Sequence, residues 1–174
     1  ARNLALLRAT VLSRQQRDAQ AIADYRELAA AFEQAGDLGA AASALNNTAL
    51  PLYRQARTDE APATLERALM LAQQGQAQDT VGFVLGSLAN HYVRDGNRER
   101  AESYYLRALE AFQLADLPAA QSTAYTNLSE IAIQRGKLDA ALQYAERALG
   151  LLPADASSSR AYLDFRLGTI LTGL

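Results

Sequence analysis

The chain has 174 residues, of which 49% are hydrophobic, 21% are charged and 7% are aromatic, a balance typical of a folded globular protein. Its formal net charge of −2 provides no general attraction to nucleic acid or to an anionic membrane, and no hydrophobic run approaches the roughly 20 residues of a membrane span. The chain has no cysteine, which excludes disulfides and thiolate metal sites, and one histidine, His91, which excludes a two-histidine metal site.

Alanine, leucine, glutamate, arginine and glutamine dominate the sequence and favour helix, so we predict an all-α protein. Small and apolar residues follow the helical spacing i, i+3, i+4, i+7, as Leu85, Leu88, Ala89 and Tyr92 show. Segments with Gly, Pro, Asp or Ser separate these stretches. The predicted helices cover residues 2–16, 18–35, 42–55, 58–74, 82–95, 98–115, 122–135, 138–151 and 161–172.

A repeat with a period of 40 residues runs through these helices. "ERAL" at 66–69 returns as "LRAL" at 106–109 and as "ERAL" at 146–149. Small residues keep the same period at two sets of positions: Ala9, Ala49, Ala89 and Ser129, and Ala21, Ala61, Ala101 and Ala141. We therefore predict one domain over 1–174, built from a helix pair used about four and a half times. The units are 2–35, 42–75, 82–115 and 122–152, with a terminal helix at 161–172.

The turns and ends of the units support further expectations. Gly96 can adopt the left-handed conformation that ends a helix, and Asn97 can cap the next one. The chain starts without methionine, and we interpret it as a piece of a longer protein. Its terminal helices are apolar, which predicts that the stack continues in the parent protein or that copies associate through these helices.

The helix pairs resemble tetratricopeptide repeats. The resemblance rests on "LANHY" (88–92) followed by Ala101 and Tyr105, on "LSEIA" (128–132) followed by Ala141, and on "LGTIL" (167–171). The chain departs from the family pattern because it has no tryptophan and a 40-residue period in place of about 34. This variant is similar to the repeats of kinesin light chains and of several bacterial regulators, and longer second helices and loops would account for the difference.

The resemblance implies a right-handed superhelical solenoid of antiparallel helix pairs. It also implies a non-catalytic module that binds a protein partner or an extended peptide in a concave groove lined by the first helices. Asparagine can pair with a peptide backbone, as the similarity to kinesin light chains implies, and arginine can bind carboxylates. The groove candidates are Asn47, Tyr53, Arg54, Ser87, Asn90, Arg94, Asn127, Glu130 and Arg166. Any soluble helix would show a similar polar surface, which is the competing interpretation.

Other features leave alternatives open. Pro51 falls inside a predicted helix and should kink it. The kink either widens the groove or is a tolerated irregularity. The alternative function is a sensory or regulatory domain of a bacterial regulator that switches an attached effector. We expect no catalytic residue, no cofactor and no metal. The one histidine, His91, fits a packing or surface role. We also expect no nucleic-acid or membrane partner, a bacterial source and a cytoplasmic location.

Overall fold

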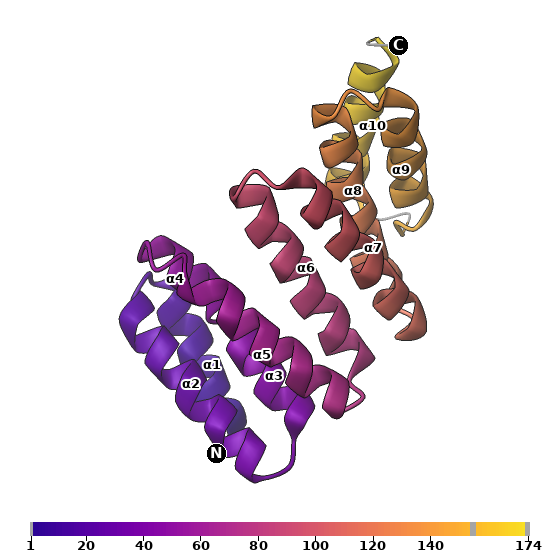
Figure 1. Cartoon of the computed structure of the whole chain (residues 1–174). Coiled ribbons are helices and arrows are strands. Elements are labelled where there is room, and N and C mark those ends of the chain that lie inside the picture. The colour runs from indigo at the N-terminus through magenta and orange to yellow at the C-terminus, as the bar shows by residue number, and fades with distance from the viewer. Residues whose placement is uncertain (1, 154–155, 173–174) are drawn as a thin grey trace.

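The computed structural model describes residues 2–153 and 156–172, and these residues form an all-α stack without strands. Figure 1 shows the helices in consecutive antiparallel pairs, with α10 added at the C-terminal end. The bounds are α1 Arg2–Arg14, α2 Asp18–Gln34, α3 Leu38–Asn46, α4 Ala49–Arg54, α5 Glu60–Gln74, α6 Gln78–Arg94, α7 Arg98–Leu114, α8 Pro118–Gln134, α9 Leu138–Gly150 and α10 Ser157–Leu171. This arrangement confirms the predicted solenoid of about four and a half helix pairs.

A short turn recurs every 20 residues and sets the period of the repeat. Each turn contains one residue in the left-handed region, with φ between 52° and 77°: Gln16, Gly36, Ala56, Gln76, Gly96, Asp116 and Gly136. The helices α2, α6, α7 and α8 have 17 residues each, so a helix and a three-residue turn together fill half of the 40-residue unit. The prediction of longer loops was therefore wrong, because 17-residue first and second helices account for the period.

Four of the first helices begin four residues earlier than predicted, at Leu38, Gln78, Pro118 and Ser157 in place of 42, 82, 122 and 161. The sequence analysis took the extra turn for connecting chain because it contains Gly, Asp and Pro. Asp37 caps α3 by accepting a hydrogen bond from the Ala40 backbone N–H at 3.1 Å, and Pro118 occupies the first turn of α8, where a missing N–H costs nothing. The predicted cap at Asn97 is confirmed, since its side chain accepts from the Arg100 N–H.

The predicted disturbance at Pro51 is a break in the helix between α3 and α4. Proline has no N–H to donate to the carbonyl of Asn47, and the two helices are separated at Asn47 and Thr48. The buried hydroxyl of Thr48 donates to the Leu45 carbonyl at 2.7 Å, which satisfies a backbone group at the break. The second unit thus has a segmented first helix.

Alanine at the helix crossings lets the helices pack closely. Ala21, Ala61, Ala101 and Ala141 are all fully buried. The alanines of the "ERAL" segments, Ala68, Ala108 and Ala148, are also fully buried. These side chains are small enough for neighbouring backbones to approach, which explains the recurring motif as a packing signature. Among the described helices, none is long and apolar enough to cross a membrane.

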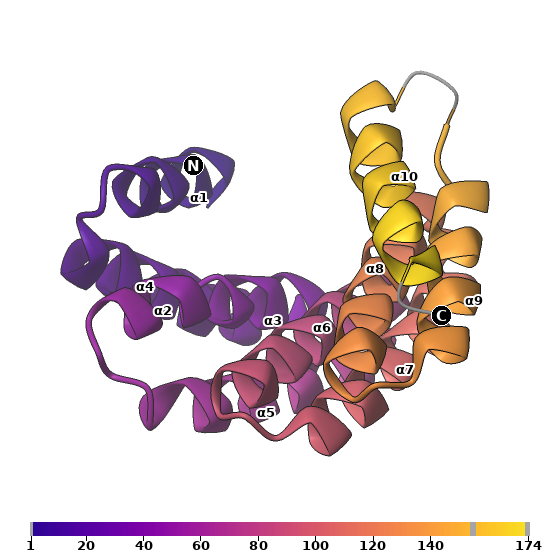
Figure 2. The same ribbon diagram turned by 90° about the horizontal axis from the view of Figure 1, so that it is seen from above.

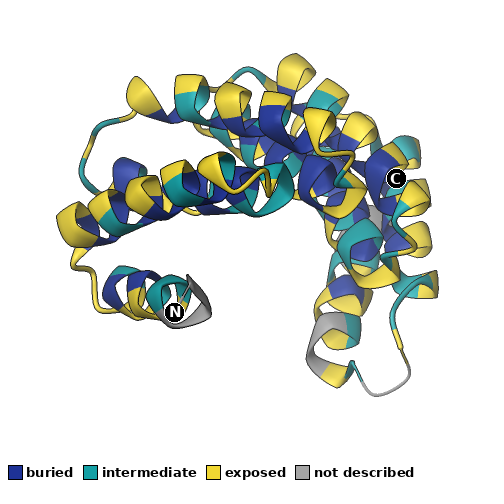
Figure 3. Ribbon diagram, turned by 90° about the horizontal axis from the view of Figure 1, so that it is seen from below, coloured by how far each residue is buried: buried dark blue, intermediate teal, exposed yellow. Residues whose placement is uncertain are grey.

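The stack is curved. Figure 2 shows α1 and α10 at the two ends of an arc, with α3, α6 and α8 between them on the inner side and α5, α7 and α9 further out. Figure 3 shows buried residues concentrated between the helices of this arc and exposed residues along its outer edges. The first helices therefore face the inside of the curve, as the resemblance implied.

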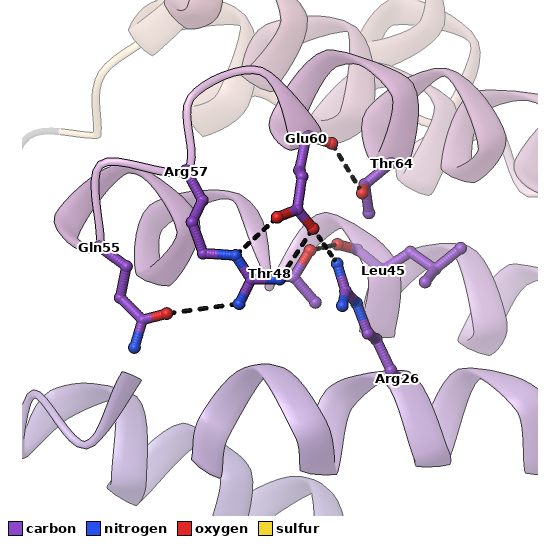
Figure 4. A network of polar contacts seen from close by, with 7 residues as sticks. All are labelled: Arg26, Leu45, Thr48, Gln55, Arg57, Glu60 and Thr64. Atoms are coloured by element: carbon purple, nitrogen blue, oxygen red, sulfur yellow. Dashed lines mark hydrogen bonds and ion pairs between the residues drawn. The ribbon is translucent and has the colours of Figure 1, made fainter. Parts of the chain in front are cut away.

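An ion-pair network joins the first two units on their second helices. Glu60 accepts hydrogen bonds from Arg57 at 2.6 and 2.8 Å and from Arg26 at 2.9 Å (Figure 4). Arg57 also donates to Gln55. These bonds lower the pKa of Glu60 to about 2 from its ordinary value of 4.5. The carboxylate at the start of α5 is thereby tied to both α2 and the preceding turn.

Candidate functional site

Three adjoining cavities follow the inner side of the arc from α1 to α10. The N-terminal cavity measures 610 Å³, the middle cavity 380 Å³ and the C-terminal cavity 320 Å³. The first two share four lining residues, Asn46, Asn47, Ser87 and Asn90, and the last two share Thr123 and Asn127. Because neighbouring cavities share walls, they form one groove, which we call the concave groove.

Six of the nine predicted residues line this groove. Asn47, Ser87, Asn90 and Asn127 line the middle cavity, and Tyr53 and Arg94 line the N-terminal one. They come from α4, α6 and α8 and from the turn after α3. Their common orientation follows from the 40-residue period, since equivalent positions of successive units face the same side of the stack. Whether they contact a ligand stays a prediction.

The other three predicted residues are engaged in ion pairs and line none of the three cavities. Arg54 donates to both carboxylate oxygens of Asp18 and, at 2.7 Å, to the Ser13 carbonyl, which ties α4 to the end of α1 and the start of α2. Arg166 of α10 donates to Glu130 of α8. Sequence position alone could not reveal these partners, because each pair joins residues 36 positions apart.

Asn90 is held in one orientation by a tyrosine that the sequence analysis did not place in the groove. The hydroxyl of Tyr105 donates to the side-chain oxygen of Asn90 at 2.6 Å. Tyr105 is 3% exposed, and this burial raises the pKa of its phenol to about 12. The amide group of Asn90 itself is exposed and lines the groove. Close to it, the side-chain oxygen of Asn46 is buried without a hydrogen-bond partner in the described part of the chain.

Tyr53 and Arg94 form an aromatic and cationic cluster with His91 in the N-terminal cavity. The rings of Tyr53 and His91 are stacked with centroids 6.1 Å apart, and the Tyr53 hydroxyl lies 3.1 Å from the Nδ1 atom of His91. The guanidinium of Arg94 lies 4.9 Å from the Tyr53 ring centroid, a cation–π contact. Burial raises the pKa of Tyr53, and the charge of Arg94 opposes that rise. His91 thus packs against Tyr53 in this cluster.

The sequence analysis also missed an aromatic wall in the middle cavity. Phe83 is 50% exposed there and contacts Phe112 edge to face, with centroids 5.1 Å apart. Phe112 reaches the cavity because Gly82 has no Cβ, which would lie 2.5 Å from its ring. A Cβ on Gly86 would meet open space. The signal in the sequence was the pair of glycines, Gly82 and Gly86, inside a helical pattern.

The groove carries almost no charge. Arg94 is the only charged side chain among the described residues that line the three cavities, and the middle cavity is lined by asparagine, serine, threonine, tyrosine and small or aromatic residues. The described residues contain no group of three His, Cys, Asp or Glu side chains placed to hold a metal ion. Such a surface suits an uncharged ligand with hydrogen-bonding groups, such as a peptide backbone.

The comparisons with known proteins agree with the fold. Residues 81–154 match the family profile described as tetratricopeptide repeat. The crystal structure of BtubC (BKLC) from P. vanneervenii has a TM-score of 0.82 at 23% identity, over 94% of this chain and 69% of that one. A signal transduction ATPase with numerous domains and a tetratricopeptide repeat sensor, from Pyrococcus horikoshii, has a TM-score of 0.70 at 17% identity, over 97% of this chain and 25% of that one. No curated protein sequence matches.

Residues 81–154 therefore match the tetratricopeptide repeat family in sequence, and the described stack as a whole has the fold of proteins built from such repeats. This confirms the resemblance. Folds of this type generally mediate protein–protein interaction and are generally non-catalytic scaffolds.

Proposed function

We propose that the chain is a non-catalytic interaction module that binds an extended segment of a partner protein in the concave groove. The observation that carries the proposal is the continuous run of uncharged hydrogen-bonding side chains through three adjoining cavities. Asparagine offers both a donor and an acceptor, so it can pair with a peptide backbone of any sequence. The guanidinium of Arg94, which has no carboxylate partner among the described residues, adds one place for a carboxylate of the bound segment.

Nucleic acid and membranes fit this surface less well than a protein does. An extended basic surface would be needed to neutralise phosphates, whereas the groove has one arginine and the chain has a net charge of −2. The proposal includes a cytoplasmic location. Self-association through the terminal helices stays a prediction, to be checked by the mass of the protein in solution.

A second candidate is a sensory domain that binds a signalling peptide or another segment of its own parent chain and thereby switches an effector. It is favoured by the likeness in fold to an ATPase described as having a tetratricopeptide repeat sensor. Both candidates use the same groove. They differ in the origin of the bound segment, which selection of a ligand can reveal.

The test is selection of random peptides displayed on phage against the wild-type chain, followed by affinity measurement with the synthetic peptides. The groove variant carries Asn47→Ala, Ser87→Ala and Asn127→Ala. The control carries Gln73→Ala, Ser103→Ala and Gln113→Ala, which remove the same chemical groups from exposed positions of the second helices α5 and α7. Both must match the wild type in helical content and melting temperature.

We expect the selected peptides to bind the control as they bind the wild type and the groove variant at least about tenfold more weakly, a loss of roughly 1.4 kcal/mol. A peptide that binds both variants equally would move the binding surface away from the groove. A peptide that matches another segment of the parent gene product would favour the sensory candidate.

A further inference from the structure

The contact between Tyr105 and Asn90 limits what Asn90 can offer to a ligand. An asparagine side chain has one carbonyl oxygen and an NH₂ group with two donors. The Tyr105 hydroxyl donates to that oxygen at 2.6 Å, a short distance for a hydrogen bond between neutral groups. The bond fixes the amide, so the exposed part of the Asn90 side chain can act as a donor.

Tyr105 is built as a lasting donor. It is 3% exposed, so its ring cannot leave the core without a large loss of packing. Burial also raises the pKa of its phenol to about 12, which keeps the hydroxyl protonated at any physiological pH. The orientation of Asn90 therefore does not depend on conditions in the cell.

The other groove asparagines lack such a partner. Asn47 and Asn127 make no side-chain hydrogen bond in the described part of the chain, so either end of their amides can turn toward a ligand. The positions of Asn90 and Tyr105 are taken by Leu50 and Leu65 in the second unit and by Glu130 and Ala145 in the fourth, so neither unit can form this hydrogen bond. In the first unit, the equivalent Tyr25 donates to Thr10 at 3.2 Å. A fixed amide is thus particular to the third unit among the described units.

We propose that Tyr105 is a positioning residue that makes Asn90 a fixed hydrogen-bond donor, and that Asn90 binds a carbonyl oxygen of the segment held in the groove. The inference rests on the proposed function and deepens it. Asn90 lines both the N-terminal and the middle cavity, so it lies where a bound segment must pass from one to the other. A carbonyl anchored there sets the register of the segment, while Asn47 and Asn127 adapt to its neighbouring groups.

The test uses a peptide selected on the wild-type chain and compares Asn90→Ala, Asn90→Asp and Tyr105→Phe. Alanine removes the donor, and aspartate replaces it with an oxygen that faces the ligand's carbonyl oxygen. If Asn90 donates, N90D binds more weakly than N90A, by about threefold or more, because two acceptors meet. The comparison is repeated at high salt, which screens any long-range effect of the new charge. Asn127→Asp is the matched control. Because no described group fixes the Asn127 amide, the loss of its NH₂ group does not force two acceptor oxygens to face each other.

Tyr105→Phe keeps the ring and removes only the hydroxyl. We expect it to weaken peptide binding about threefold to tenfold while the helical content stays unchanged. In the double variant with Asn90→Ala, the change at Tyr105 should add almost nothing, because its effect acts through Asn90. A purely structural tyrosine would weaken binding equally in both backgrounds, and that result would overturn the proposal. So would an N90D variant that binds as tightly as N90A or more tightly.

The carbonyl can belong to the peptide backbone or to a side chain of the peptide. An alanine scan of the peptide distinguishes them: a side-chain carbonyl is indicated if one substitution abolishes the difference between wild type and N90A, and a backbone carbonyl if none does. The outcomes also separate the two proposals. Failure to select any peptide rejects the proposed function, whereas a selected peptide with the wrong N90D or Y105F response rejects only the role of Tyr105 and Asn90.

Discussion

The first helices of the second and third units occupy equivalent places in the stack but use their polar residues differently. Residues 38–54 form the broken pair α3 and α4, whereas residues 78–94 form the continuous helix α6. Arg54 and Arg94 stand 40 residues apart, yet Arg54 is bound to Asp18 while Arg94 lines the groove without a carboxylate partner in the described structure. The same register can therefore hold the fold together in one unit and leave a side chain for a ligand in the next.

The largest effect that this comparison predicts is on the free energy of unfolding of Arg54→Ala. The substitution leaves the Asp18 carboxylate, whose side chain is 9% exposed, without its ion-pair partner. We expect a loss of about 2–4 kcal/mol, measured by urea denaturation. Arg94→Ala should change stability by less than about 0.5 kcal/mol, because its loss strands no buried charge.

A double variant checks the cause. Arg54→Ala combined with Asp18→Asn removes both charges and should recover part of the lost stability. Equal losses of unfolding free energy in R54A and R94A would show that the two arginines stabilise the fold to the same extent. That result would contradict the difference between the second and third units.

The next effect concerns the glycines of α6. A methyl group on Gly82 would meet the Phe112 ring at 2.5 Å, so Gly82→Ala should destabilise the chain by about 1–3 kcal/mol through overpacking. Gly86→Ala, one turn further along, meets open space and should stabilise it by about 0.5–1 kcal/mol because alanine favours helix. Thermal denaturation of the two variants measures this difference of sign.

A comparison with the second unit explains why a Cβ at position 82 clashes with Phe112 in the third unit. At the positions equivalent to Gly82 and Phe112 it has Ala42 and Ala72, so a methyl group is tolerated where the opposite residue is small. Adding Phe112→Ala to G82A should therefore remove the clash, and the second change should cost less than it does in the wild type. Independent, additive costs would contradict this account.

Much of the fold could be predicted because it depends on local, repeated properties. The 40-residue period, the buried alanines at Ala21, Ala61, Ala101 and Ala141 and the cap at Asn97 are all written in neighbouring residues. The starts of α3, α6 and α8 could not be placed, because a glycine, aspartate or proline in a first turn looks like a loop in the sequence. The left-handed residues Gln16 and Gln76 give no signal of their own either, because glutamine is not a typical turn residue.

Only those features of the groove that follow from the 40-residue period could be predicted from the sequence. Periodicity identifies which residues share a face, and six of nine candidates do line the cavities. It cannot show which polar groups are already bonded, and so Arg54, Glu130 and Arg166 were included although ion pairs occupy them. Nor could it reveal that Tyr105, from a second helix, reaches Asn90 through the core, because that contact depends on the packing of α7 against α6.

The smallest effect should be a loss of stability in acid that arises from the second unit and not from the third. Glu60 begins α5, and the equivalent position in the third unit is Arg100, which has no carboxyl group to titrate. Hydrogen bonds from Arg57 and Arg26 lower the pKa of Glu60 to about 2 in the folded chain, below its ordinary value of 4.5 (Figure 4).

A carboxyl group with a lowered folded-state pKa stabilises the fold fully above about pH 4.5, and this stabilisation is lost as the pH falls toward 2. We therefore expect Glu60→Gln to lower the urea midpoint slightly at pH 6 and to match the wild type near pH 2. Because Glu60 is on the surface, the shift should be small, as for most exposed ion pairs. Arg100→Gln is the control, and its midpoint should differ from that of the wild type by the same amount at both pH values. If the urea midpoint of E60Q differs from that of the wild type by the same amount at both pH values, the Glu60 side chain acts by packing or helix capping. The second unit would then have no acid sensitivity that the third unit lacks.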